Sequence, residues 1–363
     1  MKITIVAGAR PNFMKIAPII RAIKEHNNEG PKIEFRLVHT GQHYDKKMSD
    51  DFFEQLRIPQ PDNNLGVGSG TQAAQTAAIM VGFEKELQEN RPDLVLVVGD
   101  VTSTMACAIT AKKLCIDVAH VEAGIRSGDL TMPEEINRIV TDSITDIFFT
   151  TTQEASQTLE TSGKTAESIY FVGNTMIDTL FQNLENLQAP TWWKEEEFTS
   201  KEYFLVTLHR PGNVDDMNNL VNLLQNIMKG TSPSRVIFPV HPRTKKVIDQ
   251  SGYAHPDLYL TDPMPYLEFL YLVKNAKAVI TDSGGITEEA TVLSVPCMTL
   301  RSSTERPETI TIGSNELVGT DPVKLVPFLV KVNEGKWKKS SIPELWDGHT
   351  SERIVKIIAD RYQ

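Results

Sequence analysis

The chain has 363 residues and a formal net charge of −10, from 37 Lys and Arg against 47 Asp and Glu, and 40% of its residues are hydrophobic. This is an ordinary globular composition, at a length that normally divides into two domains. The acidic excess excludes a general nucleic-acid binder or a protein of anionic membrane surfaces, because both need a basic face. No stretch reaches the roughly 18 uncharged apolar residues of a membrane span, and neither a leader segment nor a disulfide pattern is found. We therefore expect a cytoplasmic protein without nucleic-acid or membrane partners.

Short β-branched runs alternate with helical patterns along the first half. The predicted strands are Ile3–Ala7, Ile33–His39, Leu94–Val98, Val118–Glu122, Ile147–Thr151 and Ile169–Val172. The predicted helices are Phe13–His26, Lys47–Leu56, Thr71–Glu89, Thr102–Cys115, Pro133–Thr145, Glu154–Ser162 and Thr175–Leu187. Continuous apolar strands such as LVLVVGD are typical of a parallel sheet that is covered on both faces.

A second alternating series follows a predicted connection at Gln188–Thr199. Its predicted strands are Phe204–Leu208, Val236–Val240, Leu258–Thr261, Ala278–Thr281 and Cys297–Leu300. Its predicted helices are Asp216–Lys229, Tyr266–Asn275, Ile286–Leu293 and Pro322–Val332, and an amphipathic helix closes the chain at Ser351–Tyr362. We predict an α/β fold of two doubly wound Rossmann-like domains with a cleft between them. Residues 1–187 form the first domain, joined by the C-terminal helix at about 350–363, and residues 188–349 form the second.

Polar residues follow the strands of the first half, where ligands bind in doubly wound sheets. Arg10 and Lys15 stand near the start of a helix, where helix dipole and cation together favour an anion; the alternative for Arg10 is a local cap or salt bridge. Asp100 either caps the next helix or points a carboxylate into the cleft. Glu122 ends a buried strand, which is costly unless the residue is paired or functional. Glu134 begins a Pro-Glu-Glu helix, which by composition alone indicates capping.

Metal and dinucleotide sites are not favoured. His39 and His43 are four residues apart, as a metal-binding pair on a helix would be, but Gly41 between them and the exit from a strand favour loop hydrogen bonding. The first strand and helix carry GARPNFMK in place of the G-x-G-x-x-G signature of NAD and FAD sites. We expect no metal and no cofactor.

The second half offers the features of a phosphate site. Ser283, Gly284 and Gly285 lie between a strand and a helix, where bare amides at a positive helix end bind phosphate. Glu289, one turn inside that helix, could accept hydrogen bonds from ribose hydroxyls. His209 follows another strand in an HRPGN segment, and Arg306 lies in the segment STERPE.

Nine segments together resemble the non-hydrolysing UDP-N-acetylglucosamine 2-epimerase family. They are GARPNFMK, TGQH, GDVTST, HVEAGIRSGDL, MPEEINR, HRPGN, PVHPR, TDSGGITEEA and STERPE, in order from Gly8 to Glu308. The family is similar in fold to GT-B glycosyltransferases and interconverts UDP-N-acetylglucosamine and UDP-N-acetylmannosamine without NAD or metal. The resemblance implies anti elimination of UDP to an enzyme-bound 2-acetamidoglucal, followed by re-addition with the proton returned to the opposite face of C2. It also implies a homodimer and, in bacteria, precursor synthesis for surface polysaccharides.

The resemblance assigns roles to residues of this chain. Acid and base work falls to Asp100, Glu122 and Glu134, with His209 as a further catalytic residue. Substrate binding falls to Arg10, Lys15, Met264, Phe269, Ser283, Gly284, Gly285, Glu289 and Arg306. The pattern of a second, allosteric site is partly lost, because Asp45 stands where a Gln is expected.

Three other interpretations share some of these motifs. A hydrolysing relative would release free N-acetylmannosamine, but its HVEAG and PEE regions differ. A GT-B glycosyltransferase would need an acceptor site and would leave the three carboxylates without use. A non-enzymatic nucleotide-sugar binder would have no reason to keep carboxylates at all three positions.

Overall fold

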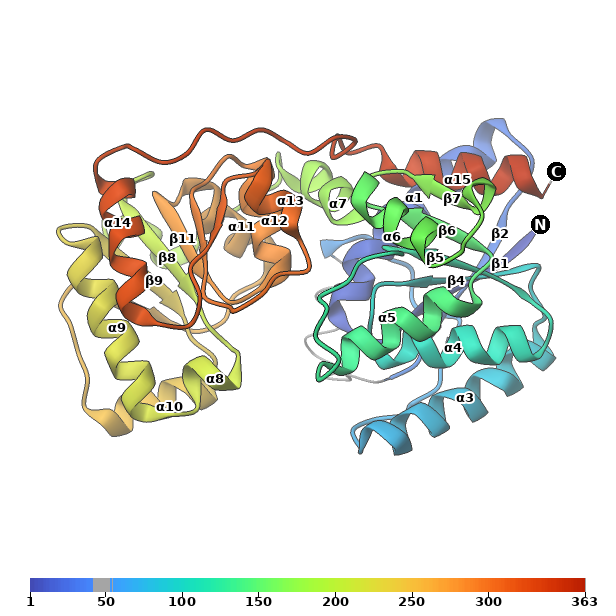
Figure 1. The fold of residues 1–363 in the computed structure, drawn as a ribbon, viewed down its shortest axis with the longest axis horizontal. Coiled ribbons are helices and arrows are strands. Elements are labelled where there is room, and N and C mark those ends of the chain that lie inside the picture. The colour runs from blue at the N-terminus through green and yellow to red at the C-terminus, as the bar shows by residue number, and fades with distance from the viewer. Residues whose placement is uncertain (42–52, 54, 363) are drawn as a thin grey trace. The chain divides into compact units, whose positions relative to one another are not determined.

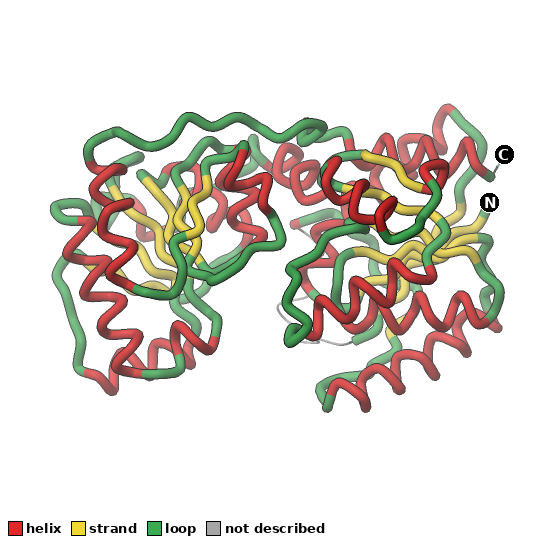
Figure 2. The backbone as a smooth tube through the Cα atoms, viewed as in Figure 1, coloured by secondary structure: helices red, strands yellow, loops and turns green. Residues whose placement is uncertain are grey.

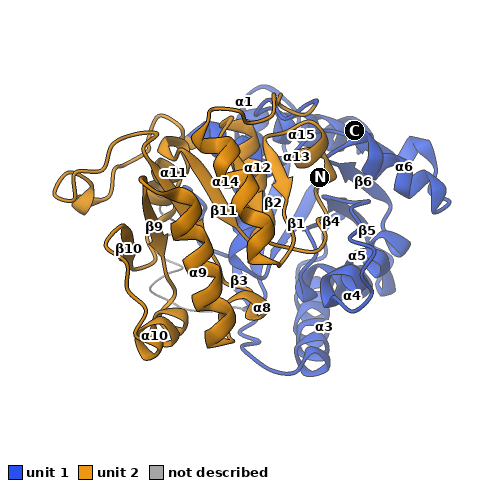
Figure 3. Cartoon of the chain, turned by 60° about the vertical axis from the view of Figure 1, so that its left-hand side comes forward, with its two compact units in different colours: residues 1–182, 344–363 blue, residues 183–343 orange. Residues whose placement is uncertain are grey.

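Two parallel β-sheets with helices on both faces make up the computed structural model, which describes residues 1–41, 53 and 55–362 (Figures 1 and 2). The sheets belong to two units (Figure 3). Unit 1 comprises residues 1–182 and 344–363, and unit 2 comprises residues 183–343. The strands and helices alternate throughout, which confirms the predicted α/β class.

The sheet of unit 1 has the strand order β3-β2-β1-β4-β5-β6-β7. The strands are β1 (Lys2–Ala7), β2 (Glu34–His39), β3 (Asn63–Asn64), β4 (Leu94–Val98), β5 (Asp117–Val121), β6 (Ile147–Thr150) and β7 (Ile169–Phe171). All neighbouring strands pair in parallel, and β4 is buried along its whole length. The order reverses between β1 and β4, so ligands are expected beyond the carboxyl ends of these strands.

Helices cover both faces of this sheet. They are α1 (Arg10–Glu29), α3 (Gln72–Glu89), α4 (Thr102–Lys113), α5 (Pro133–Ile144), α6 (Gln153–Thr161), α7 (Thr175–Asn183) and α15 (Thr350–Arg361). Helices α3, α4 and α5 lie in a row on one face, whereas α1 and α15 pack against each other on the opposite face (Figure 1).

Helix α15, at the C-terminal end of the chain, belongs to unit 1. Asp178 on α7 accepts hydrogen bonds from the amides of Thr350 and Ser351, at 3.1 and 2.7 Å, and from the Ser351 hydroxyl. Ahead of the helix, the buried indole of Trp346 donates to the carbonyl oxygen of Thr151. The capped first turn and the buried apolar face of α15 dock this helix on the first sheet.

Unit 2 repeats the doubly wound order, as β10-β9-β8-β11-β12-β13. Its strands are β8 (Tyr203–Thr207), β9 (Arg235–Pro239), β10 (Leu258–Thr261), β11 (Ala278–Thr281), β12 (Cys297–Thr299) and β13 (Asn315–Leu317). Its helices are α8 (Pro211–Val214), α9 (Met217–Thr231), α10 (Pro242–Ser251), α11 (Tyr266–Asn275), α12 (Gly284–Val292), α13 (Pro307–Thr311) and α14 (Val326–Asn333). Two apolar clusters, one on each face of the sheet, form its core. The reversal here lies between β8 and β11.

The structure differs from the sequence-based prediction at several elements. The predicted linker at Gln188–Thr199 contributes buried Trp193 and Phe198 to the core of unit 2. Helices α8, α10 and α13 and strands β3 and β13 were not predicted, because each is short or opens with a Pro that reads equally as a turn. The predicted helix at Lys47–Leu56 lies mostly outside the described residues, as do His43 and Asp45.

Candidate active site

The first polar cluster of unit 1 joins α1 to the end of β5. The ammonium group of Lys15 forms an ion pair with the carboxylate of Glu122, and both residues are buried. Glu122 has a φ of +71°, a left-handed conformation that is costly for a side chain other than glycine and that gathers at functional sites. The ion pair keeps a charged carboxylate in a place from which water is largely excluded.

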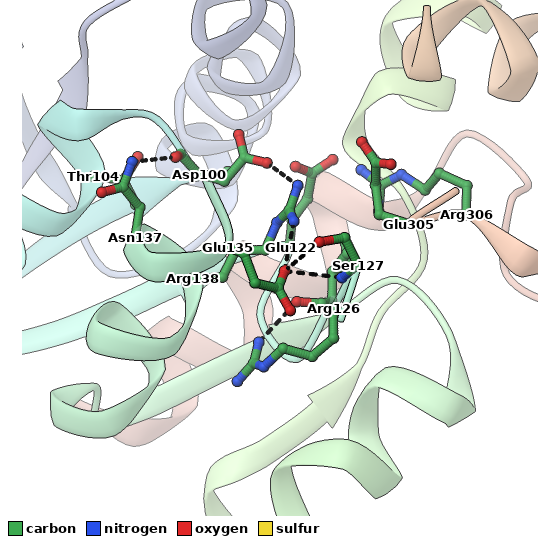
Figure 4. Close-up of polar contacts among 12 residues, drawn as sticks. Asp100, Thr104, Glu122, Arg126, Ser127, Glu135, Asn137, Arg138, Glu305 and Arg306 are labelled. Atoms are coloured by element: carbon green, nitrogen blue, oxygen red, sulfur yellow. Dashed lines mark hydrogen bonds and ion pairs between the residues drawn. The ribbon is translucent and has the colours of Figure 1, made fainter. Parts of the chain in front are cut away.

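The neighbouring strand, β4, ends at Gly99 and delivers Asp100. Helix α4 has Val101 as its N-cap, so Asp100 does not cap it, and one of its carboxylate oxygens instead pairs with the guanidinium of Arg138 on α5 (Figure 4). The backbone carbonyl of Asp100 accepts a hydrogen bond from the Asn137 side chain at 2.8 Å. Gly99 has a φ of +65°, and a Cβ there would lie 2.9 Å from the Lys15 ammonium. The two pairs, Lys15–Glu122 and Arg138–Asp100, therefore lie close together.

Helix α5 contributes two adjacent acids in different environments. Glu135 is buried and receives hydrogen bonds from the amides of Ser127 and Gly128 and from Arg138 (Figure 4). Burial favours the neutral acid, but these donors outweigh it and lower the pKa of Glu135. Glu134 is half-buried and forms no hydrogen bond or ion pair with the residues that the structure describes. Glu135 thus has a structural task, whereas Glu134 is available for other chemistry.

The turn after β1 places Arg10 as the first, exposed residue of α1. Asn12 fixes this turn, because its side-chain oxygen accepts from the amides of Gly8 and Ala9 at 3.0 and 3.1 Å. The side-chain nitrogen of Asn12 donates to the carbonyl of Val98 at the end of β4. Asn12 was not among the residues predicted to be functional, although its place in the first turn of a helix is a capping position.

In unit 2, buried Asp282 organises the turn after β8. Its carboxylate pairs with Nδ1 of His209 at 2.7 Å and accepts from the amide of Arg210 and the side chain of Asn213. Burial opposes ionisation, but the hydrogen bonds from His209 and Asn213 prevail and lower the pKa of Asp282. The His209 side chain is otherwise 61% exposed. An ionised partner at Nδ1 orients the ring and leaves Nε2 for a ligand.

Helix α12 follows β11 and has Ser283 as its N-cap, with no side-chain capping bond. Gly284 and Gly285 form its first turn, whereas the sequence predicted a helix from Ile286. Both glycines and Ser283 are half-buried rather than covered. A nine-residue helix that begins with two glycines offers amide donors and a positive dipole end to an anion.

Further along α12, two successive acids are buried. Glu289 accepts a hydrogen bond from the hydroxyl of Tyr266 at 2.9 Å, and burial raises its pKa to about 7, helped by the nearby charge of Glu288. Glu288 pairs with the guanidinium of Arg306 at 2.7 Å. Arg306 was expected to contact substrate, and the structure gives it this internal partner. Met264 and Phe269 pack, partly exposed, against the core cluster beside α11.

The structure thus groups the candidate residues of each unit separately. Lys15, Glu122 and Asp100 lie together in unit 1, and His209, Ser283 to Gly285 and Glu289 all stand on elements that follow β8 and β11 in unit 2. Across the described part of the chain, no three or more His, Cys, Asp or Glu residues are arranged to hold a metal ion. No helix among the described residues is long and apolar enough to cross a membrane.

Comparison with known proteins identifies the family. The family model described as UDP-N-acetylglucosamine 2-epimerase matches residues 24–359. The chain belongs to this family. Membership makes it an enzyme of the isomerase class and supports UDP-N-acetylglucosamine 2-epimerase activity, as the sequence motifs predict.

Individual relatives of this epimerase family member match over their whole length. The chain is 42% identical to the UDP-N-acetylglucosamine 2-epimerase of Methanocaldococcus jannaschii, over 99% of each chain. It is 37% identical to the UDP-2,3-diacetamido-2,3-dideoxy-D-glucuronate 2-epimerase of Pseudomonas aeruginosa, again over 99% of each. A crystal structure of the Methanocaldococcus jannaschii enzyme in complex with UDP-GlcNAc and UDP matches with a TM-score of 0.86 and 41% identity, covering 99% of this chain and 100% of the other. Because relatives include archaeal proteins, family membership does not imply a bacterial role.

Proposed function

We propose that the chain interconverts UDP-N-acetylglucosamine and UDP-N-acetylmannosamine through a 2-acetamidoglucal intermediate. A base takes the proton from C2 of the sugar while the bond from C1 to the phosphate oxygen breaks and UDP leaves with the electron pair. The phosphate oxygen then attacks C1 again, and C2 receives a proton on the opposite face. The observation that best supports this proposal is the pair of carboxylates, Asp100 and Glu122, at the ends of adjacent strands, each held by a buried cation.

The carboxylates have the different environments that acid and base catalysis on two faces requires. Glu122 is buried with the Lys15 ammonium, Asp100 is partly exposed beside Arg138, and Glu134 lacks a partner among the described residues. We assign the proton transfers at C2 to this set of three acids, with Lys15 as a positioner of Glu122 or of the sugar.

Unit 2 would bind the nucleotide. In this proposal the first turn of α12, Ser283 to Gly285, receives the diphosphate, and Arg10, His209 and Arg306 add positive charge as UDP departs. Glu289 accepts the ribose hydroxyls, and the backbone at Met264 and Phe269 contacts uracil.

One experiment tests the reaction directly. The protein is incubated with UDP-N-acetylglucosamine in D2O and followed by NMR. Deuterium at C2 and a mixture with UDP-N-acetylmannosamine are expected. Free N-acetylmannosamine would indicate the hydrolysing reaction, and UDP binding without exchange at C2 would refute the epimerase proposal. UDP-2,3-diacetamido-2,3-dideoxy-D-glucuronate is tested in the same assay as an alternative substrate, because the Pseudomonas aeruginosa relative is named for it.

Variants in the same assay test the three acids. Asp100→Asn, Glu122→Gln and Glu134→Gln should each lower turnover by about 100-fold or more, while UDP affinity stays nearly unchanged. Glu160→Gln, at an exposed acid on α6, is the matched control and should retain wild-type turnover. A wild-type rate in any of the three variants would remove that acid from the mechanism.

We further propose that the product serves as a glycosyl donor precursor for surface polysaccharides, in bacteria or archaea.

We also propose that the enzyme works as a homodimer. Exposed Val81 on α3 and Ile136 and Ile139 on α5 are apolar residues that a second copy could cover. Sedimentation of the purified protein measures the dimer, and a monomer at micromolar concentration would contradict it.

A further inference from the structure

His120 is a fully buried histidine on β5 that the proposed mechanism does not use. Its Nδ1 lies 2.7 Å from a carboxylate oxygen of Asp142, and its Nε2 lies 2.8 Å from the carbonyl oxygen of Gly99. Gly99 directly precedes Asp100, and Asp142 lies on α5. The imidazole ring thus bridges a helix and the end of a neighbouring strand.

The groups around the ring determine the hydrogen bonds that it forms. A carbonyl oxygen has no proton to give, so Nε2 of His120 donates to Gly99. Asp142 is already an acceptor at its other oxygen, for the amide of Gly124 at 3.1 Å and the guanidinium of Arg126 at 2.7 Å. Burial acts to raise the pKa of Asp142, but the contacts with His120 and Arg126 outweigh burial and lower it. Nδ1 of His120 completes the set of contacts around Asp142, so the ring bridges this side chain and the Gly99 carbonyl.

Both ends of this bridge lead to proposed catalytic acids. The Gly99 peptide is held on its other side as well, since its amide donates to the carbonyl of Val121 at 3.0 Å, one residue before Glu122. At the far end, Asp142 holds the amide of Gly124, two residues after Glu122. The turn that carries Asp100 and the turn that carries Glu122 are thus joined by one chain of hydrogen bonds.

Helix α5 carries the buried charged residues that hold this arrangement in place. Glu135, Arg138 and Asp142 are spaced at three and four residues, so they share one helical face, and all three are buried. Arg138 pairs directly with Asp100, and Asp142 acts through His120. A row of buried charges on one helix therefore contacts the ends of both β4 and β5.

We propose that His120 and Asp142 are positioning residues that hold the turns of Asp100 and Glu122 in a fixed relation. The inference rests on the proposed function, because that function makes these two acids the proton carriers. The reaction needs proton transfer on two faces of one carbon, so a small displacement of either acid lowers the rate. A Cβ placed on Gly99 would lie 3.4 Å from a Glu122 carboxylate oxygen, so the two turns are within contact of one another.

Two amide variants separate the two arms of the ring. The side-chain nitrogen of Gln can replace Nε2, and that of Asn can replace Nδ1. His120→Gln therefore keeps the hydrogen bond to the Gly99 carbonyl, and His120→Asn keeps only the contact with Asp142. We expect His120→Asn to lower kcat by about 100-fold and His120→Gln by about 10-fold, with KM and UDP affinity within about twofold of wild type.

Amide hydrogen exchange supplies a measurement that does not depend on turnover. In His120→Asn, residues 99–101 should exchange at least about 10-fold faster than in His120→Gln, because only the Gln variant retains the bond to the Gly99 carbonyl. The inference would be overturned if both variants lost the same factor in kcat and these losses paralleled their losses of stability. Equal rates of amide hydrogen exchange at residues 99–101 in the two variants would also overturn it. Wild-type protein without C2 exchange would refute the proposed function instead, and the hydrogen-exchange comparison would still decide whether the bridge holds the turn.

Discussion

Glu289 makes a testable link between pH and stability. The residue is 3% exposed, burial raises its pKa from 4.5 to about 7, and the Tyr266 hydroxyl only partly offsets burial. Between these two values the unfolded chain has lost the proton and the folded chain retains it, so stability falls as pH rises through this window. The full loss is on the order of 3 kcal/mol, at about 1.4 kcal/mol for each pKa unit.

Glu289→Gln removes this titration while keeping the size of the side chain. We expect the free energy of unfolding of wild type, relative to Glu289→Gln, to fall by about 2.5 kcal/mol between pH 5 and pH 8.5. Urea unfolding at a series of pH values, without nucleotide, measures the difference. Tyr266→Phe removes the hydrogen bond that favours the carboxylate, so it should shift the midpoint of the fall to higher pH. A flat difference between wild type and Glu289→Gln would refute burial as the cause of the raised pKa.

Two further substitutions test the pairs of the candidate site. Lys15→Met leaves the Glu122 charge buried without its main partner and should cost about 3 kcal/mol in urea unfolding, whereas adding Glu122→Gln should recover much of that loss; additive losses would contradict the pairing. Asp282→Asn should weaken UDP binding about 10-fold by calorimetry, because His209 loses its charged orienting partner; unchanged affinity would show that this orientation is unimportant.

The sequence predicted the fold class and the strand ends well, because both follow from local patterns. Continuous apolar strands indicated buried parallel sheets. Asp100 and Ser283 lie shortly after predicted strands, and Glu122 is the last residue of one. The short helix α10 was not predicted, because a segment that begins with Pro resembles a loop in sequence. The segment at Gln188–Thr199 resembles a linker in sequence because its charges and Pro outweigh its Trp residues.

The partners of the candidate residues could not be predicted, because they depend on contacts between distant segments. Asp100 could read as a helix cap until the structure brought Arg138, 38 residues away, to its carboxylate. Likewise His120 sits in the HVEAG motif, but only the fold shows that both of its nitrogens are used. The sequence did contain one signal for these contacts. Glu135, Arg138 and Asp142 share one face of α5 and are buried, whereas the apolar residues Ile136 and Ile139 are exposed.

The place of α15 bears on the order in which the protein is made. Residues 344–363 belong to unit 1, yet the ribosome adds them only after all of unit 2 has been synthesised. Asp178 therefore cannot bond to Thr350 and Ser351 until they are synthesised. The apolar surface of α1 that α15 covers remains exposed while the intervening residues are translated. Unit 2 is continuous in sequence and can finish folding first, so the unit that carries Asp100 and Glu122 is completed last.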